Sequence, residues 1–481
     1  MIAALSCNTA PLTAYSPSDE NPWDAQKVMN IYRRLGFGAD QTMIDQGLAK
    51  TPSQFIDDLV DEAINMAPTP APSWADLDYG DPGFGDVNSD NIFSWQMQAI
   101  DDLLSENLRG RLTMFWSNHF VTKLDVHFCG SWLYSYYNIL QTYAIGDFKA
   151  FVGAIGLTPS MLAFLNGLEN TKYSPNENYA RELYELFTLG ENNGYTQEDI
   201  VETSRALTGY NILDDWCGTV TYNPDTFDED DKTIFGQTGN WNYDDVIRIL
   251  FEQKAPLIAE FICRKLYRYF VSPTANEDIV SEMATTFLDA DFQIGPVLRE
   301  LFKSEHFFEQ KNFGSIIKSP YDLTIGFLKE TGFSIQETDR QALPYFNGVL
   351  GQNYFDPVDV AGWQGDKDWI SSSTLTGRWQ IMEYMCWWVW NMNEEQFRNL
   401  AIDLSDNSND PYVVTKAVID RFTSKTLHTP EDYETATDIF KGDVPANYYE
   451  TGQWNLYWDS APWQVINLFF YIIKMPEFQL K

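Results

Sequence analysis

The chain has 481 residues, and its 69 acidic and 32 basic side chains give a formal net charge of -37 at pH 7. Charge of this sign repels phosphate backbones and anionic lipid headgroups, so nucleic acid and a membrane surface are poor partners. With 44% hydrophobic residues the chain can bury a large core. Its longest apolar run, near 465–474, is shorter than the about 20 residues that a membrane-spanning helix needs, so a membrane span is not predicted.

Aromatic and sulfur-containing residues add two constraints. Aromatic residues make up 15% of the chain, including 16 tryptophans and 26 tyrosines. Tyr and Trp combine an apolar body with a polar tip, so this enrichment slightly favours a binding surface. The five cysteines lie far apart without a CxxC spacing, which excludes a dense disulfide framework and predicts buried or incidental thiols. They are Cys7, Cys129, Cys217, Cys263 and Cys386.

The chain begins with a predicted extended segment, 1–22, that lacks the basic region and apolar run of a secretory signal peptide. Residues 24–36 form the first predicted helix, which stops at Gly36. A second predicted helix, 51–65, has Pro52 at its first helical position. Helical periodicity then recurs at about 91–106, 109–121, 131–144, 147–155, 176–188, 197–208, 243–252, 255–270, 276–288, 294–303, 320–330, 375–396, 411–423 and 461–473.

The exception to this helical pattern lies at 215–241. Two β-prone runs, GTVTYNP and KTIFGQTG, flank the acidic turn DTFDEDD and predict a small hairpin. The turn lacks the central glycine and terminal glutamate of an EF-hand loop, which favours a solvated turn over a calcium site. We therefore predict a mainly α protein: one large multi-helix domain over 23–481, with a small β-hairpin insertion near 215–241 and a soft seam near 310.

Residues 174–190, SPNENYARELYELFTLG, carry an apolar and a polar stripe, each at helical spacing. If the polar stripe is a solvated helix face, each of its ion pairs is worth only a few tenths of a kcal/mol. If it is a site, Glu182 and Glu185 are candidate acids, bases or metal ligands. Arg181 would then tune these carboxylates or bind an anionic group, and Asn178 would orient a ligand.

Residues 111–123, RLTMFWSNHFVTK, place Asn118 and His119 at the end of an aromatic helix. His119 is one of four histidines and is a candidate general base or metal ligand, although a core histidine with one satisfied ring nitrogen is commoner. No paired-histidine spacing is present, so a divalent cation would need carboxylates from distant positions. The sequence also has no nucleotide or flavin motif, which leaves the cofactor unknown.

Residues 361–380 set three tryptophans among glycines and serines before a helix that carries Arg378. Trp363 and Trp369 are candidate aromatic platforms for a sugar or peptide. The same side chains could equally hold the loop to the core. Both interpretations stay open at this stage.

Several segments together resemble the bacterial family catalogued as domain of unknown function 1800. They are YRRLGFG (32–38), LRGRLTMFWSNHF (108–120), NENYARELYELFTLGENNGYTQEDIVETSRALTGY (176–210), KTIFGQTGNW (232–241) and GWQGDKDWISSSTLTGRW (362–379). The resemblance implies a protein whose relatives are commonly bacterial, often exported, and often encoded beside a second family without an assigned function. It therefore suggests an envelope or extracellular pathway and a co-encoded protein as partner, while the compartment of this chain stays open.

Two functional hypotheses follow. The favoured one is a binding or scaffolding component of such a pathway, with a polymeric saccharide or peptide as a possible ligand and the polar residues fixing helix register. The alternative is a hydrolase-type enzyme, acting on a saccharide or peptide, in which His119 assists proton transfer by Glu182 and Glu185. The hypotheses differ in whether these three side chains meet at one cleft that solvent can reach.

Overall fold

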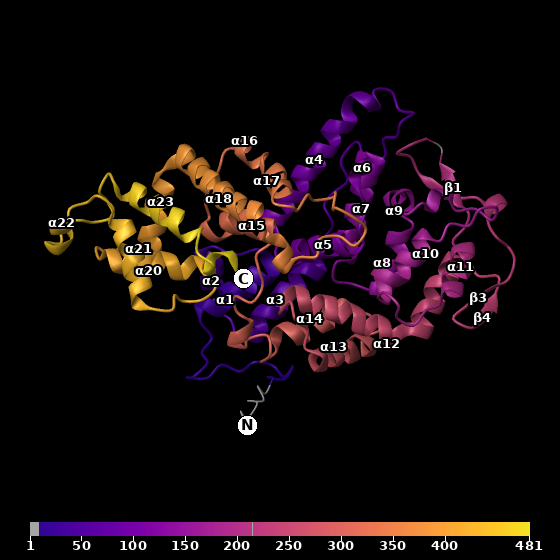
Figure 1. Ribbon diagram of the computed structural model, residues 1–481, viewed down its shortest axis with the longest axis horizontal. Coiled ribbons are helices and arrows are strands. Elements are labelled where there is room, and N and C mark those ends of the chain that lie inside the picture. The colour runs from indigo at the N-terminus through magenta and orange to yellow at the C-terminus, as the bar shows by residue number, and fades with distance from the viewer. Residues whose placement is uncertain (1–8, 214) are drawn as a thin grey trace. The chain divides into compact units, whose positions relative to one another are not determined.

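The computed structural model describes residues 9–213 and 215–481 (Figure 1). Helices dominate this part of the chain, and its strands form only two small antiparallel pairs, so the predicted mainly α fold is confirmed. No described helix is both long and apolar enough to cross a lipid bilayer. Cys7 lies outside the described residues.

The chain folds into two compact units. Unit 1 holds the described residues up to Ser16 together with Pro52–Phe307 and Tyr354–Trp363. Unit 2 holds Pro17–Thr51, Phe308–Asn353 and Gln364–Lys481. Each unit is therefore built from segments that are distant in sequence. The single domain over 23–481, with its seam near 310, stays a prediction.

Unit 1 packs its helices around an aromatic core. Trp116 is completely buried, and its ring centroid lies 5.6 Å from that of Phe148 and 5.4 Å from that of Phe151. The long α12 packs beside α13, and α13 beside α14 (Figure 1). The helices are α3 (Pro52–Asn65), α4 (Phe84–Ser105), α5 (Leu108–His119), α6 (Leu124–His127), α7 (Gly130–Tyr143), α8 (Phe148–Gly156), α9 (Pro159–Phe164), α10 (Asn178–Glu182), α11 (Gln197–Ala206), α12 (Tyr243–Phe270), α13 (Glu277–Asp289) and α14 (Ile294–Lys303).

The β insertion of unit 1 is confirmed, but its strand pairing differs from the predicted single hairpin. Strand β1 (Tyr210–Leu213) pairs with β2 (Val220–Tyr222), and β3 (Lys232–Ile234) pairs with β4 (Gln237–Gly239). The second predicted run therefore folds back on itself. Phe235 and Gly236 at its turn both have positive φ, which is the geometry of a tight two-residue hairpin.

Unit 2 is also helical and has its own aromatic core. The ring of Phe469 lies 5.7 Å from Phe397 and 5.9 Å from Phe327. The predicted first helix is present and is capped by Asp24, whose side chain accepts from the Lys27 amide. The helices are α1 (Ala25–Gly36), α2 (Gln41–Leu48), α15 (Pro320–Thr331), α16 (Glu337–Arg340), α17 (Leu343–Val349), α18 (Ser372–Asn393), α19 (Glu395–Ser405), α20 (Pro411–Phe422), α21 (Pro430–Lys441), α22 (Ala446–Glu450) and α23 (Ala461–Ile472).

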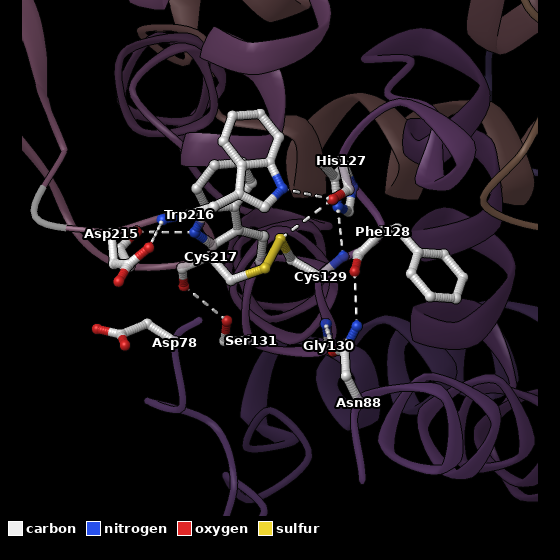
Figure 2. Close-up of a disulfide and its surroundings, with 12 residues drawn as sticks. Asp78, Asn88, His127, Phe128, Cys129, Gly130, Ser131, Asp215, Trp216 and Cys217 are labelled. Atoms are coloured by element: carbon white, nitrogen blue, oxygen red, sulfur yellow. Dashed lines mark hydrogen bonds between the residues drawn. A yellow bond between two sulfur atoms is a disulfide. The ribbon is translucent and has the colours of Figure 1, made fainter. Parts of the chain in front are cut away.

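A disulfide between Cys129 and Cys217 joins the start of α7 to the loop between β1 and β2 (Figure 2). Both cysteines are buried, and the main-chain carbonyl of His127 beside them accepts from the Trp216 indole at 2.9 Å. The prediction of buried or incidental thiols is therefore wrong for this pair. The two cysteines are 88 residues apart and only the fold brings them together. Cys263 and Cys386 are free buried thiols, as expected.

Candidate functional site

The segment 174–190 is helical but changes its hydrogen-bonding pattern midway. Helix α10 is followed directly by the π-helix η2 (Leu183–Thr188). The carbonyl of Tyr184 accepts from the amide of Leu189 at 2.8 Å and from that of Gly190 at 3.1 Å. π-helical turns are rare and are frequent at functional sites. This backbone geometry makes the segment a candidate site independently of its charges.

Most of the polar stripe forms a network at the surface. The Arg181 guanidinium donates to Glu177 at 2.9 Å, to Glu185 at 3.3 Å and to Gln197 at 3.0 Å. Asn178 donates through its side-chain amide to the side chain of Asn166 at 3.2 Å. Because Arg181 is 36% exposed, water screens its ion pairs, and each contributes about 1 kcal/mol or less.

Glu182 differs from the rest of the stripe. Its side chain is half-buried, and no hydrogen bond or ion pair joins its carboxylate to another described residue. Burial, and then the neighbouring charge of Glu185, raise the pKa of Glu182, while Arg181 lowers it. Glu182 therefore keeps its proton to a higher pH than an ordinary glutamate, which is a property of general acids.

His119 is buried at the end of α5 between a carbonyl and an amine. Its Nε2 lies 3.0 Å from the carbonyl oxygen of Phe187 in η2, and its Nδ1 lies 2.9 Å from Nζ of Lys265 on α12. Because a carbonyl only accepts, Nε2 carries the proton, and Nδ1 accepts from Lys265. Burial, and then Lys265, hold the pKa of His119 well below its usual value, so the imidazole is neutral.

Lys265 is the only charged group bonded to His119 in the described chain. Burial lowers its pKa to about 8. Its ammonium lies 3.5 Å from the Leu186 carbonyl oxygen and 5.1 Å from the centroid of Phe261. Segment 174–190 thus meets His119 through its main chain. No hydrogen bond in the described residues joins His119 to Glu182 or Glu185.

An open cleft of about 590 Å³ lies next to this segment. Tyr195 and Phe235 contribute aromatic rings to it, and the Lys254 ammonium lies 4.5 Å from the Phe235 centroid. The phenol oxygen of Tyr195 accepts from the Asn192 amide at 2.8 Å, and burial and then the nearby Glu185 raise the pKa of Tyr195. The polar stripe therefore lies near the cleft wall. The lining residues are Gly194, Tyr195, Thr196, Glu198, Asp199, Thr233, Phe235, Gly236 and Lys254.

Sequence reasoning missed this cleft, although a local signal was present. Thr196 and Asp199 form a capping box that starts α11. That signal fixes the helix start and with it the place of Tyr195 on the cleft wall. Lys254 and Phe235 come from distant segments, and no spacing in the sequence indicates that they meet Tyr195.

Asn118 and Trp363 are joined by two hydrogen bonds. The side-chain oxygen of Asn118 accepts from the Trp363 amide at 2.6 Å, and its side-chain nitrogen donates to the Trp363 carbonyl at 2.9 Å. A Cβ at Gly362 would lie 2.3 Å from the Asn118 side chain, so glycine is required there. The buried Trp363 is therefore held in place by Asn118 in unit 1.

In unit 2, Trp369 and Arg378 are also buried. Arg378 donates through Nε to Gln479 at 2.8 Å and through Nη2 to the Lys318 carbonyl at 2.6 Å. Its Nη1 has no partner among the described residues. Burial lowers the pKa of Arg378 to about 10.

Acidic side chains that could hold a divalent cation are dispersed. In the part of the chain that the structure describes, no three His, Cys, Asp or Glu side chains group as metal ligands. Within the acidic turn, Asp228 is buried and accepts from Nε of Arg205 at 2.8 Å. This ion pair with Arg205 neutralises the buried carboxylate of the turn.

Comparison with known protein families gives a match to this chain. The family described as "Protein of unknown function (DUF1800)" matches residues 30–480. The chain belongs to the DUF1800 family. This confirms the resemblance, and the match includes every candidate residue named above. No curated protein and no solved structure matches the chain.

The His119 environment predicts a dependence of stability on pH. Because the pKa of His119 is lower in the folded chain, its stabilising effect is complete above about pH 6.5 and is lost as the pH falls. Replacing His119 by Gln should reduce the slope of unfolding free energy against pH, between pH 6.5 and 5, by up to about 1.4 kcal/mol per unit. Lys265 is protonated throughout this range and adds no slope.

Urea unfolding at several pH values measures this slope. The matched control is His428→Gln, which removes an exposed histidine. Equal slopes for wild type and His119→Gln would show that His119 is not held neutral in the folded protein.

Proposed function

We propose that this DUF1800 protein is a binding component of an envelope or extracellular pathway and that its cleft takes a saccharide chain. The observation that carries the proposal is the cleft beside η2. Tyr195 and Phe235 supply ring surfaces for the apolar faces of a sugar, and Lys254 and Glu198 supply a hydrogen-bond donor and acceptors for its hydroxyl groups. An open cleft with these groups suits one segment of a longer polymer.

Binding is favoured over catalysis because the candidate catalytic groups are engaged separately. His119 is buried, neutral, and bonded on both ring nitrogens. Glu185 is ion-paired with Arg181 at 3.3 Å. In these contacts the groups have structural roles, which is what the binding hypothesis requires.

The disulfide supports the extracellular part of the proposal. Disulfides persist in oxidising compartments and are rare in the cytosol of most organisms. The bond between Cys129 and Cys217 is buried, so it is part of the folded core of unit 1. A partner protein of the same pathway would be exposed to the same compartment.

Replacing Tyr195 by Ala tests the binding proposal. This change should weaken binding of a saccharide identified on a glycan array at least about tenfold, or ~1.4 kcal/mol, because it removes one aromatic wall. Titration calorimetry with that saccharide measures the dissociation constant. The control is Tyr173→Ala, which removes an aromatic ring that is 79% exposed and outside the cleft.

Two results would count against the proposal. One is the absence of any bound saccharide on the array for the folded wild-type protein. The other is equal affinity of wild type and Tyr195→Ala, which would place the ligand elsewhere on the molecule.

A second candidate function, hydrolysis of the bound chain, is favoured by one observation. Glu182 is a half-buried carboxylate without a hydrogen-bond partner among the described residues, its pKa is raised, and it directly precedes the π-helix. These properties suit a general acid. Hydrolysis would release new reducing ends from the saccharide.

The Glu182→Gln variant separates the two functions. If Glu182 is a general acid, the release of reducing ends should fall about 100-fold or more in this variant. The control is Glu177→Gln, which removes an exposed carboxylate bonded to Arg181. Binding without release of reducing ends by the wild type would support the binding function alone, and equal release by Glu182→Gln would remove Glu182 as the acid.

A further inference from the structure

Unit 2 contains a buried group of basic side chains, which we call the basic cluster: Arg33, Lys318, Arg378 and Arg421. Each of them is at most 5% exposed. The carboxylate among them belongs to Glu330, which is also buried. This concentration of positive charge is unexpected in a chain with a formal net charge of -37.

The Glu330 carboxylate is committed to one member of the cluster. Arg33 donates to it through Nε at 2.5 Å and through Nη2 at 3.2 Å. Arg421 contacts main-chain oxygens instead, including the Glu330 carbonyl at 3.0 Å from its Nη2. The Glu330 carboxylate therefore compensates mainly the charge of Arg33.

The nearby Asp322 is paired outside the cluster. Its Oδ2 lies 2.6 Å from Nζ of Lys481, and both side chains are buried. This pair is neutral as a unit. It leaves Lys318 and Arg378 without a carboxylate in hydrogen-bond contact, while Asp322 attracts both charges from a longer distance and Glu330 attracts that of Lys318.

Lys318 and Arg378 both have unused donors. The Lys318 ammonium makes no hydrogen bond or ion pair with a described residue, and it lies 4.5 Å from the centroid of Phe478. Arg378 is completely buried, and its Nη1 has no partner in the described chain. The two residues are neighbours, because Nη2 of Arg378 donates to the main-chain carbonyl of Lys318.

Burial of a cation without a carboxylate in contact is unfavourable, whereas a bound anion would add charge compensation and accept from the unused donors. Arginine and lysine are the usual ligands of phosphate and sulfate, because their N–H groups make charge-assisted hydrogen bonds to the oxygens. We propose that Lys318 and Arg378 bind one small oxyanion, of the phosphate or sulfate class, inside unit 2. This site is independent of the saccharide cleft in unit 1.

The anion would act as a structural element of unit 2. Lys318 directly precedes the cap residue of α15, and Arg378 lies on α18. Gln479, which accepts from Nε of Arg378, comes from the C-terminal segment. One bound oxyanion would therefore link three separate segments of the chain.

Ion analysis and calorimetry of the same preparation test the site. The full chain is exchanged into chloride buffer at constant ionic strength, and one part is denatured and analysed by ion chromatography for phosphate and sulfate. The other part is titrated separately with each anion. The amount of oxyanion that copurifies and the amount that binds in the titration should add up to one ion per chain. If neither measurement detects a bound oxyanion, the proposal is overturned.

The Lys318→Met variant should bind the oxyanion at least tenfold more weakly than the wild type. Lys441→Met is the control, because Lys441 is partly exposed and pairs with Asp438. Unchanged affinity in Lys318→Met would overturn the assignment of Lys318 as a ligand.

A second measurement uses only the wild type, in case Lys318→Met does not fold. The pKa of Lys318 is lowered to about 8, mainly by burial. Sulfate binds the protonated amine, so its affinity should fall up to tenfold per pH unit above pH 8. Constant sulfate affinity from pH 7 to 9 would contradict the proposed site.

Discussion

The candidate site depends on the Lys265 ammonium, which is partly buried and makes no ion pair with a carboxylate of the described chain. A partly buried cation still needs acceptors, and here they are Nδ1 of His119 and the carbonyl of Leu186. Accepting at Nδ1 leaves the His119 proton on Nε2, which donates to the carbonyl of Phe187. Helix α5, helix α12 and the π-helix are thereby joined through one imidazole ring.

Two glycines determine how the chain runs after the π-helix. Gly190 and Gly194 both have positive φ, and a Cβ at either would approach α12 to 3.1 Å from Phe261 or 2.4 Å from Leu257. The chain can therefore pass close along α12 only with glycine at these positions. It then reaches Tyr195 at the wall of the cleft. The buried link and the ligand-facing surface are consecutive parts of one segment.

The polar residues around the π-helix divide into two physical classes. Arg181, Glu177 and Glu185 form hydrogen bonds near the surface, where water weakens each interaction. His119 is buried and hydrogen-bonds to the Phe187 carbonyl and to the partly buried Lys265, where an unmade bond is costly. His119 and Lys265 contact the backbone of the π-helix, and Tyr195 lines the cleft that we propose for saccharide binding.

Local patterns predicted much of the fold but little of the site. Apolar periodicity and capping residues indicated most helices, because both depend on residues within a few positions of each other. The hydrogen bond between His119 and Lys265 joins residues 146 positions apart, and the disulfide joins residues 88 positions apart. The π-helix could not be predicted either, because the sequence of 174–190 is equally compatible with an α-helix.

The most direct test of this account is amide hydrogen exchange in the Lys265→Met variant. If Lys265 fixes His119, and His119 fixes the π-helix, exchange of the amides at 186–190 should be at least about tenfold faster than in the wild type. Exchange in α13, which takes no part in this link, should stay the same. Equal exchange at 186–190 in the two proteins would contradict the account, because the π-helix would then be held without Lys265.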